Sequence, residues 1–203
     1  MLRFWDDRTG SYAELAVEPS IPLRVCIHGP ADGTWSGLAD LRILLVGDVL
    51  TRIAARVEKL GWHIVIYFEM PDLPELEDFF TSLPTDVVVD HMGTPDVKKG
   101  VEHPENQRFH ALMDKHKNFW VKVTCPERMS LAGPPYDDVV PFGRALVERF
   151  PDRVIWGTDW PHPNMKKVAP DDGMLVDYIP KVAPTAAQQQ ALLVDNPMRL
   201  YWS

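Results

Sequence analysis

The 203-residue sequence is poor in cysteine, in positive charge and in long apolar runs. Cys26 and Cys125 match no metal-binding or redox spacing, so we expect two reduced thiols rather than a disulfide. The 21 lysines and arginines face 29 aspartates and glutamates, and the net charge of −8 argues against a nucleic-acid partner or a basic membrane-binding face. No apolar run approaches the roughly 20 residues of a membrane span, and the first residues do not resemble a signal peptide. We therefore expect a cytoplasmic protein without a membrane partner.

Three motifs that carry common chemistries are absent from the sequence. It contains no His-x-His pair, which metal-dependent hydrolases built on (β/α)₈ barrels commonly use. It also has no Gly-x-Ser-x-Gly nucleophile turn and no Gly-x-Gly-x-x-Gly phosphate loop. These absences argue against serine catalysis and a dinucleotide, and we predict neither a bound metal nor another cofactor.

An alternation of helical and strand patterns runs from residue 48 to the C-terminus. The strand patterns are continuously apolar rather than alternating, as is typical of parallel strands buried on both faces. Four strands separated by helices predict right-handed βαβ crossovers and an α/β fold with a parallel sheet. The predicted strands start near residues 63, 86, 118 and 153, and the predicted helices cover 48–61, 73–83, 105–117, 137–150, 174–182 and 185–196.

Polar side chains follow each predicted strand at its carboxyl end. In parallel α/β folds the loops at these ends converge on one mouth, where sites are built. We therefore expect these groups to surround one cleft. They are Tyr67 and Glu69 after the first strand, His91 after the second, Thr124 and Arg128 after the third, and Asp159 after the fourth.

Each of these residues also has a purely structural interpretation. Asp159 would then cap its turn, His91 would bond a backbone carbonyl, Arg128 would be a surface charge and Tyr67 a core residue. For His162 and Asn164 the structural alternative is that His162 only braces the loop after the last strand and Asn164 only caps the next turn. Glu69 is interpreted as a supporting acid, and His103, His110 and His116 as surface residues.

The set of groups at the strand ends narrows the chemistry. Asp159 can act as a general base and His91 can donate a hydrogen bond to a carbonyl oxygen. Arg128 can grip a carboxylate with two hydrogen bonds. Together they suit hydrolysis of an anionic ester or lactone.

Long motifs in residues 49–203 resemble the amidohydrolase-superfamily lactonases related to 2-pyrone-4,6-dicarboxylate hydrolase. They include "WHIVIYFE", "VVVDHMG", "KVTCPER", "RVIWGTDWPHPN" and "NPMRLYWS". The resemblance implies a (β/α)₈ TIM barrel, metal-independent lactone hydrolysis and a role in bacterial degradation of lignin-derived aromatics. It implies that Asp159 activates water, that His91 polarises the lactone carbonyl, and that Tyr67, Arg128 and Asn164 hold the substrate. Thr94 stands where the family usually has arginine, which puts one substrate contact in doubt.

Residues 1–48 depart from the family pattern. The expected His-x-His strand and the following arginine-bearing units do not precede residue 49, and only two short strand-like runs, 23–29 and 41–47, are visible. Six strands at most do not close an eight-stranded barrel. We therefore predict a divergent segment, 1–48, joined to the last four βα units of an amidohydrolase-type barrel, 49–203. A compact divergent barrel that recruits His28 is the alternative.

Three functions remain open at this stage. The first is metal-independent hydrolysis of a small anionic lactone. The second is a metal-dependent amidohydrolase or decarboxylase, against which the missing His-x-His counts. The third is a catalytically silent half-barrel that self-associates through an open sheet edge.

Overall fold

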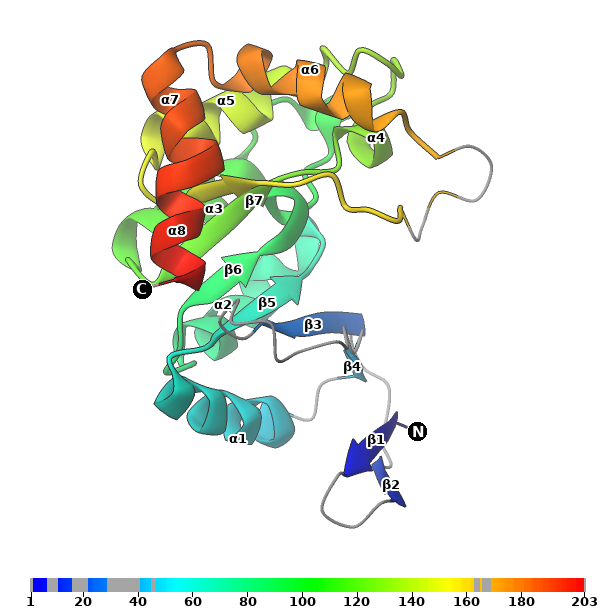
Figure 1. Ribbon diagram of the computed structural model, residues 1–203, viewed down its shortest axis with the longest axis vertical. Helices are drawn as coiled ribbons and strands as arrows, with labels where there is room; N and C mark the ends of the chain where they lie inside the picture. The colour runs from blue at the N-terminus through cyan, green and yellow to red at the C-terminus, as the bar shows by residue number, and fades with distance from the viewer. Residues whose placement is uncertain are drawn as a thin grey trace.

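The computed structural model describes residues 2–6, 11–15, 22–28, 41–44, 47–162, 165 and 169–202, with side chains from Leu50 onward. Its main feature is a six-stranded sheet in the order β4-β3-β5-β6-β7-β8 (Figure 1). The last four strands are parallel to one another. They are β5 (His63–Tyr67), β6 (Val87–Val89), β7 (Phe119–Val123) and β8 (Val154–Trp156). Each begins within one residue of its predicted start, which confirms the four βα units.

The parallel strands are apolar throughout because both faces of the sheet are buried. Ile64, Ile66 and Val121 point into a large core beneath the helices. The alternate residues Val65, Val88 and others form a second, smaller core with Leu200 from the C-terminal helix. Burial on both faces removes the period-two pattern that a half-exposed strand shows.

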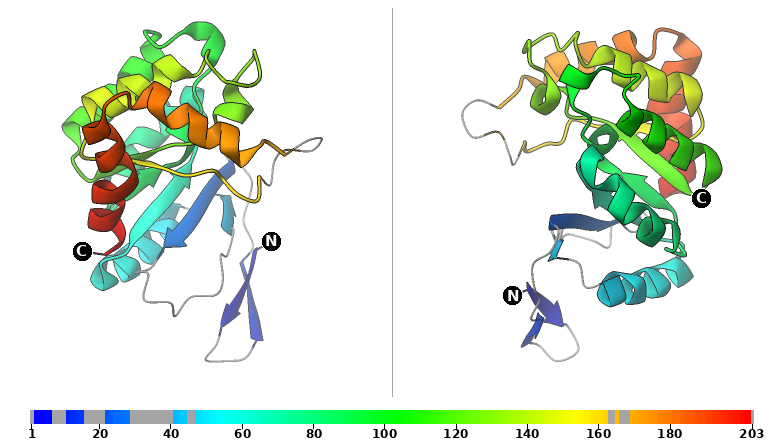
Figure 2. Two further views of the ribbon diagram at one scale, coloured as in Figure 1. Left: turned by 45° about the horizontal axis from the view of Figure 1, so that its top comes forward. Right: turned by 180° about the vertical axis from the view of Figure 1, so that it is seen from behind.

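Helices cover the two faces unequally. Seen from behind, α3 lies in front of the strands (Figure 2). It shares the large core with α6, whereas Leu200 of α8 packs in the smaller core on the other face. None of the described helices is both long and apolar enough to cross a membrane. The helices are α1 (Gly47–Val57), α2 (Leu73–Thr81), α3 (Pro104–Lys115), α4 (Pro126–Met129), α5 (Val140–Arg149), α6 (Asp172–Val182), α7 (Ala186–Gln190) and α8 (Asn196–Tyr201). A π-helical segment, Ala191–Asp195, joins α7 to α8.

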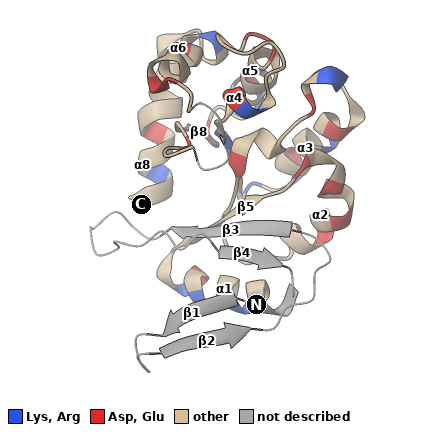
Figure 3. Ribbon diagram, turned by 90° about the vertical axis from the view of Figure 1, so that its right-hand side faces the viewer, with Lys and Arg blue, Asp and Glu red and all other residues tan. Residues whose placement is uncertain are grey.

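The outer helices carry charges of both signs. Acidic side chains mark α2, whereas α3 has acidic and basic ones together (Figure 3). Nε of Arg108 on α3 lies 2.7 Å from Oε2 of Glu77 on α2, and this ion pair links the two helices. Such an exposed pair contributes little to stability, so the apolar faces beneath hold these helices on the sheet.

The N-terminal strands differ from a continuing parallel barrel. The two predicted runs form β3 (Pro22–His28) and β4 (Leu41–Leu44), and β3 pairs antiparallel with both β4 and β5. The main sheet has the six strands that the sequence allowed at most, and β1 (Leu2–Asp6) and β2 (Ser11–Leu15), which the sequence did not predict, form a separate antiparallel pair. Two short strands that pair only with each other leave no long apolar signal in the sequence. The division at residue 48 stays a prediction, as does a role for His28, whose side chain lies outside the described part.

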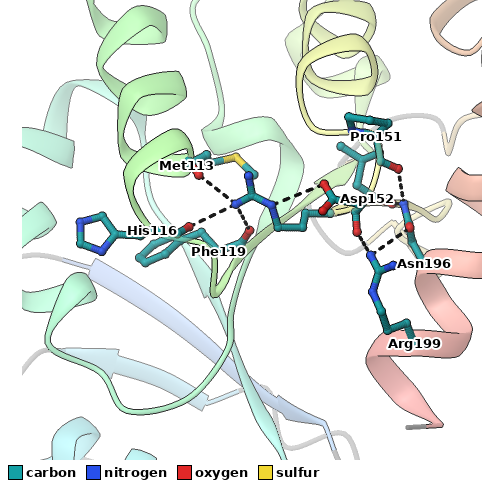
Figure 4. A network of polar contacts seen from close by, with 9 residues as sticks. Met113, His116, Phe119, Pro151, Asp152, Asn196 and Arg199 are labelled. Atoms are coloured by element: carbon teal, nitrogen blue, oxygen red, sulfur yellow. Dashed lines mark hydrogen bonds and ion pairs between the residues drawn. The ribbon is translucent and has the colours of Figure 1, made fainter.

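Buried polar contacts fix the last strand. Arg153, directly before β8, donates from Nη1 to three backbone carbonyls (Figure 4). The acceptors are the oxygens of Met113 at 2.8 Å, His116 at 3.1 Å and Phe119 at 3.2 Å. One buried cation thus fastens the end of α3, the start of β7 and the start of β8, because its three acceptors lie on the first two and Arg153 itself precedes the third.

A side-chain amide on the C-terminal helix also holds β8. Asn196 donates from Nδ2 to the carbonyl oxygens of Pro151 at 2.8 Å and Val154 at 2.7 Å (Figure 4). Arg199, one turn later, donates to the carbonyl oxygen of Asp152. The two contacts position the strand that leads to Asp159.

Candidate active site

The carboxyl ends of the four parallel strands bring the predicted polar residues together. Tyr67 is the last residue of β5, and His91 lies in a short turn, Asp90–Gly93, directly after β6. Arg128 lies on α4, which begins three residues after the end of β7, and Asp159 follows β8 by three residues. The topology alone produces this meeting, because parallel strands present the same ends to one edge of the sheet.

His91 is held in a fixed orientation. Its Nδ1 lies 2.7 Å from the Thr124 hydroxyl, and its Nε2 lies 3.7 Å from Oδ1 of Asp159. Its backbone has φ 51°, a left-handed conformation that residues with side chains adopt only when their surroundings impose it. Burial lowers the pKa of His91 to about 4, so the ring is neutral at pH 7.

Asp159 lies between the imidazole and a guanidinium. Its Oδ2 is 3.5 Å from Nη2 of Arg128 and accepts no hydrogen bond from the described residues. Burial opposes the charge of Arg128, but neighbouring Cys125 and Asp159 outweigh this effect and leave the pKa of Arg128 raised. Arg128 therefore stays a cation beside a carboxylate oxygen that is available to another donor.

The remaining predicted residues lie at different distances from this centre. The Tyr67 ring stands edge-on to His91, with centroids 5.9 Å apart. Glu69 is exposed, and the hydroxyl of Thr94 is buried without a hydrogen-bond partner in the described part. Asn164 lies outside the described residues. The functional roles assigned to these side chains stay predictions.

Two of these histidines are buried, which contradicts the surface position expected of His110 and agrees with the bracing role expected of His162. His110 is buried, not on the surface, because α3 turns it toward the core, where its ring meets Phe150 edge-on at 6.0 Å. His162 is also buried, with Nε2 3.2 Å from Oδ1 of Asp172 and Nδ1 3.8 Å from Oε1 of Glu127. His103 and His116 are partly exposed.

Cys125 and Glu127 are site neighbours that the sequence reasoning missed. The Cys125 sulfur lies 3.8 Å from Nε2 of His91. The position of Cys125 directly after the third strand pattern was the available signal, but cysteine spacing alone gave it no role. Glu127 looked like an ordinary helix acid, and only the packing of α4 buries it.

One group of residues has the composition of a metal site. Within the described part, a nitrogen of His91, the sulfur of Cys125 and a carboxylate oxygen of Asp159 lie within 4.8 Å of one another. Zinc uses these donor types, and Thr124 holds the other ring nitrogen of His91 as an orienting partner would. Burial raises the pKa of the Cys125 thiol, however, and so opposes the thiolate that ligates metals. The donors fit a divalent cation in kind and spacing, but not in the charge of the sulfur.

The arrangement offers a carboxylate base, a neutral imidazole donor and a fixed cation within a few ångströms. A water held by Asp159 would lie beside His91, which suits attack on a carbonyl carbon. Arg128 supplies an anchor for an anionic substrate.

Comparison with known proteins identifies the family. The amidohydrolase family model matches residues 23–202. The chain is 64% identical over 163 residues to a 2-pyrone-4,6-dicarboxylate hydrolase of Comamonas testosteroni, covering 76% of this chain and 53% of that protein. It is 37% identical over 158 residues to a 4-sulfomuconolactone hydrolase of Rhizobium radiobacter, covering 76% and 52%. The chain thus spans about half the length of the curated relatives it matches.

Solved structures give the same fold. A probable 2-pyrone-4,6-dicarboxylic acid hydrolase from Acinetobacter baumannii, solved with citric acid bound, aligns with a TM-score of 0.64 at 26% identity, covering 74% of this chain and 56% of that one. An apo structure from Agrobacterium tumefaciens aligns at 0.66 and 28%, covering 75% and 54%. The four parallel strands and their helices are therefore a partial barrel of the TIM type, and the chain belongs to the amidohydrolase family.

Proposed function

We propose that this site hydrolyses a small anionic lactone of the 2-pyrone-4,6-dicarboxylate type. The observation that carries the proposal is Asp159, whose Oδ2 is free of hydrogen bonds from described residues and lies between Arg128 and His91. The names of the two lactone hydrolases that the chain resembles support the substrate class.

The geometry suggests how each group acts. Asp159 takes a proton from a water molecule, whose oxygen attacks the lactone carbonyl carbon. If the Thr124 hydroxyl donates to Nδ1 of His91, the ring proton sits on Nε2 and stabilises the oxygen that becomes negative. The ring C–O bond then breaks, and the leaving oxygen receives the proton that Asp159 took from the water. Arg128 holds a substrate carboxylate beside Tyr67, and the resemblance to the lactonases adds Asn164 as a further contact.

Loss of the pyrone ultraviolet absorbance tests this function. The purified chain is incubated with 2-pyrone-4,6-dicarboxylate, with and without added divalent metal, beside the Comamonas relative. We expect slow turnover, because the sequence has no His-x-His pair and one missing oxyanion donor costs about 10²–10³ in rate. Absence of both turnover and calorimetric binding would overturn the proposal.

A metal-dependent reaction is the second candidate, favoured by the donor cluster of His91, Cys125 and Asp159. These three residues would hold the cation, which would supply Lewis-acid polarisation of the carbonyl. The metal arm of the same assay separates the two: a rate that rises with stoichiometric metal and falls with chelator favours this alternative.

A silent, self-associating half-barrel is the third candidate. In the described sheet β8 is an edge strand, and an unpaired edge is a template for another chain. The cytoplasmic location predicted from the sequence is part of every one of these proposals, whereas the role in aromatic degradation belongs to the lactone-hydrolysis proposal alone.

A further inference from the structure

A buried carboxylate next to the site has no part in the chemistry above. The Glu127 side chain is 2% exposed, and neither of its oxygens has a hydrogen bond among the described residues. The His162 side chain facing it is 4% exposed, and its Nδ1 is likewise without such a bond. Most buried polar atoms in proteins are paired, so three unpaired ones at one place need an explanation.

The position of the pair suggests its purpose. Glu127 directly precedes Arg128 on α4, and His162 follows Asp159 by three residues. Oε1 of Glu127 and Nδ1 of His162 are 3.8 Å apart, so the two side chains face each other across the same gap that Arg128 and Asp159 span. The contact therefore joins α4 to the turn after β8 at a second point.

That turn needs to be held. Asp159 has φ 65° and His162 has φ 59°, and the His162 amide donates to the Asp159 carbonyl oxygen at 2.7 Å. A residue with a side chain adopts the left-handed conformation only at a conformational cost, which contacts with its surroundings must offset. His162 is also held on its other side, because its Nε2 lies 3.2 Å from Oδ1 of Asp172 at the start of α6.

A hydrogen bond across the gap would satisfy both side chains. Asp172, as a carboxylate, accepts a hydrogen bond from the Nε2–H of His162, which leaves Nδ1 facing Glu127. Nδ1 and Oε1 are 3.8 Å apart, so a small side-chain rotation brings them to hydrogen-bond distance.

We propose that Glu127 and His162 are positioning residues that lock the turn after β8 and so set Asp159 against Arg128 and His91. Their function is to keep the base in place, not to touch the substrate. The proposal depends on the proposed lactone hydrolysis only where turnover is measured. The contact between Glu127 and His162 restrains the turn whether or not substrate is bound.

Amide hydrogen exchange of the 203-residue chain, measured by NMR, tests the hold directly. Glu127→Leu keeps an apolar fit for the buried site but cannot pair with His162, whereas Glu127→Gln keeps a hydrogen-bonding group. We expect Glu127→Leu to speed exchange of the His162 and Met165 amides, which bond within the turn, by about tenfold or more. Glu127→Gln should restore most of the protection, and Glu105→Gln, in an exposed ion pair on α3, is the matched control.

The outcomes separate this proposal from the proposed function. Unchanged exchange in Glu127→Leu overturns the positioning role, whatever the enzyme does. Faster exchange together with a lower kcat, an unchanged KM and rescue by Gln supports both proposals. Faster exchange in a chain that neither binds nor hydrolyses the lactone supports positioning and overturns the function. If Glu127→Leu does not fold, His162→Asn provides the same comparison.

Discussion

At the scale of single residues, Asp159 is the group on which the proposed chemistry depends. Asp159→Asn keeps the shape of the side chain but cannot accept a proton from water. We expect turnover to fall by about 10²–10⁴, with little change in the affinity for the dicarboxylate. Progress curves at high enzyme concentration and calorimetric titration measure the two quantities separately. A variant that keeps most of its turnover would show that another group is the base.

For Arg128 we expect an effect on the affinity for the substrate. Its side chain is only 17% exposed, so a carboxylate that it binds is partly removed from water. We expect Arg128→Ala to weaken binding of pyrone dicarboxylate by roughly 2–4 kcal/mol if the contact is bidentate. Calorimetry compares it with Arg108→Ala, whose guanidinium pairs with Glu77 on the outer helices and should leave the affinity unchanged.

His91 makes stability depend on pH in a defined window. Its folded pKa of about 4 lies below the ordinary value of 6.5, so between these values the unfolded chain binds a proton that the folded chain does not. Stability therefore falls as pH drops through the window, and we expect a loss of roughly 2 kcal/mol from this residue between pH 7 and 5.

Urea denaturation at both pH values, for the native chain and for His91→Gln, measures that loss. The difference in unfolding free energy between the two pH values should be smaller in the variant. His110, whose pKa burial also lowers, contributes equally to both proteins and cancels from the comparison. Equal pH dependence in the two proteins would contradict the assignment to His91.

At the scale of elements, the close approach of α5 to α6 and β7 depends on Gly143. A Cβ there would lie 2.7 Å from Val182, 2.9 Å from the Tyr178 hydroxyl and 3.0 Å from Val123. We expect Gly143→Ala to destabilise the chain by about 1–3 kcal/mol through overpacking. The midpoint of urea denaturation measures it. Gly157→Ala is the matched control, since its Cβ would meet only Thr124, at 3.9 Å. Equal midpoints for the two variants would show that the helices can separate without cost.

At the scale of the whole molecule, the edge of the sheet and the exposed apolar residues of the C-terminal helices favour self-association. In the described sheet β8 is an edge strand, and Val194, Met198 and Trp202 are 45%, 51% and 57% exposed. We expect sedimentation velocity to give a mass above 23.1 kDa that rises with protein concentration. A monomer at every concentration would contradict this and weaken the silent-scaffold alternative.

The sequence by itself determined the four βα units and the edge at which the site lies. Continuous apolar runs followed by helical periodicity placed β5 to β8 within one residue of their starts. Because the carboxyl ends of parallel strands lie at one edge of the sheet, the sequence alone also predicts that Tyr67, His91, Arg128 and Asp159 lie close together. Both signals are local, so a single sequence carries them.

Only the tertiary structure decided which of these groups touch and what surrounds them. The short strands β1 and β2, the burial of His110 and the Glu127–His162 contact depend on packing between segments far apart in the chain. Glu127 lies on an exposed-looking helix turn in the sequence, and it becomes a buried partner because the turn after β8 folds over α4. Burial and side-chain pairing are properties of the assembled core, whereas strand and helix patterns are properties of the chain.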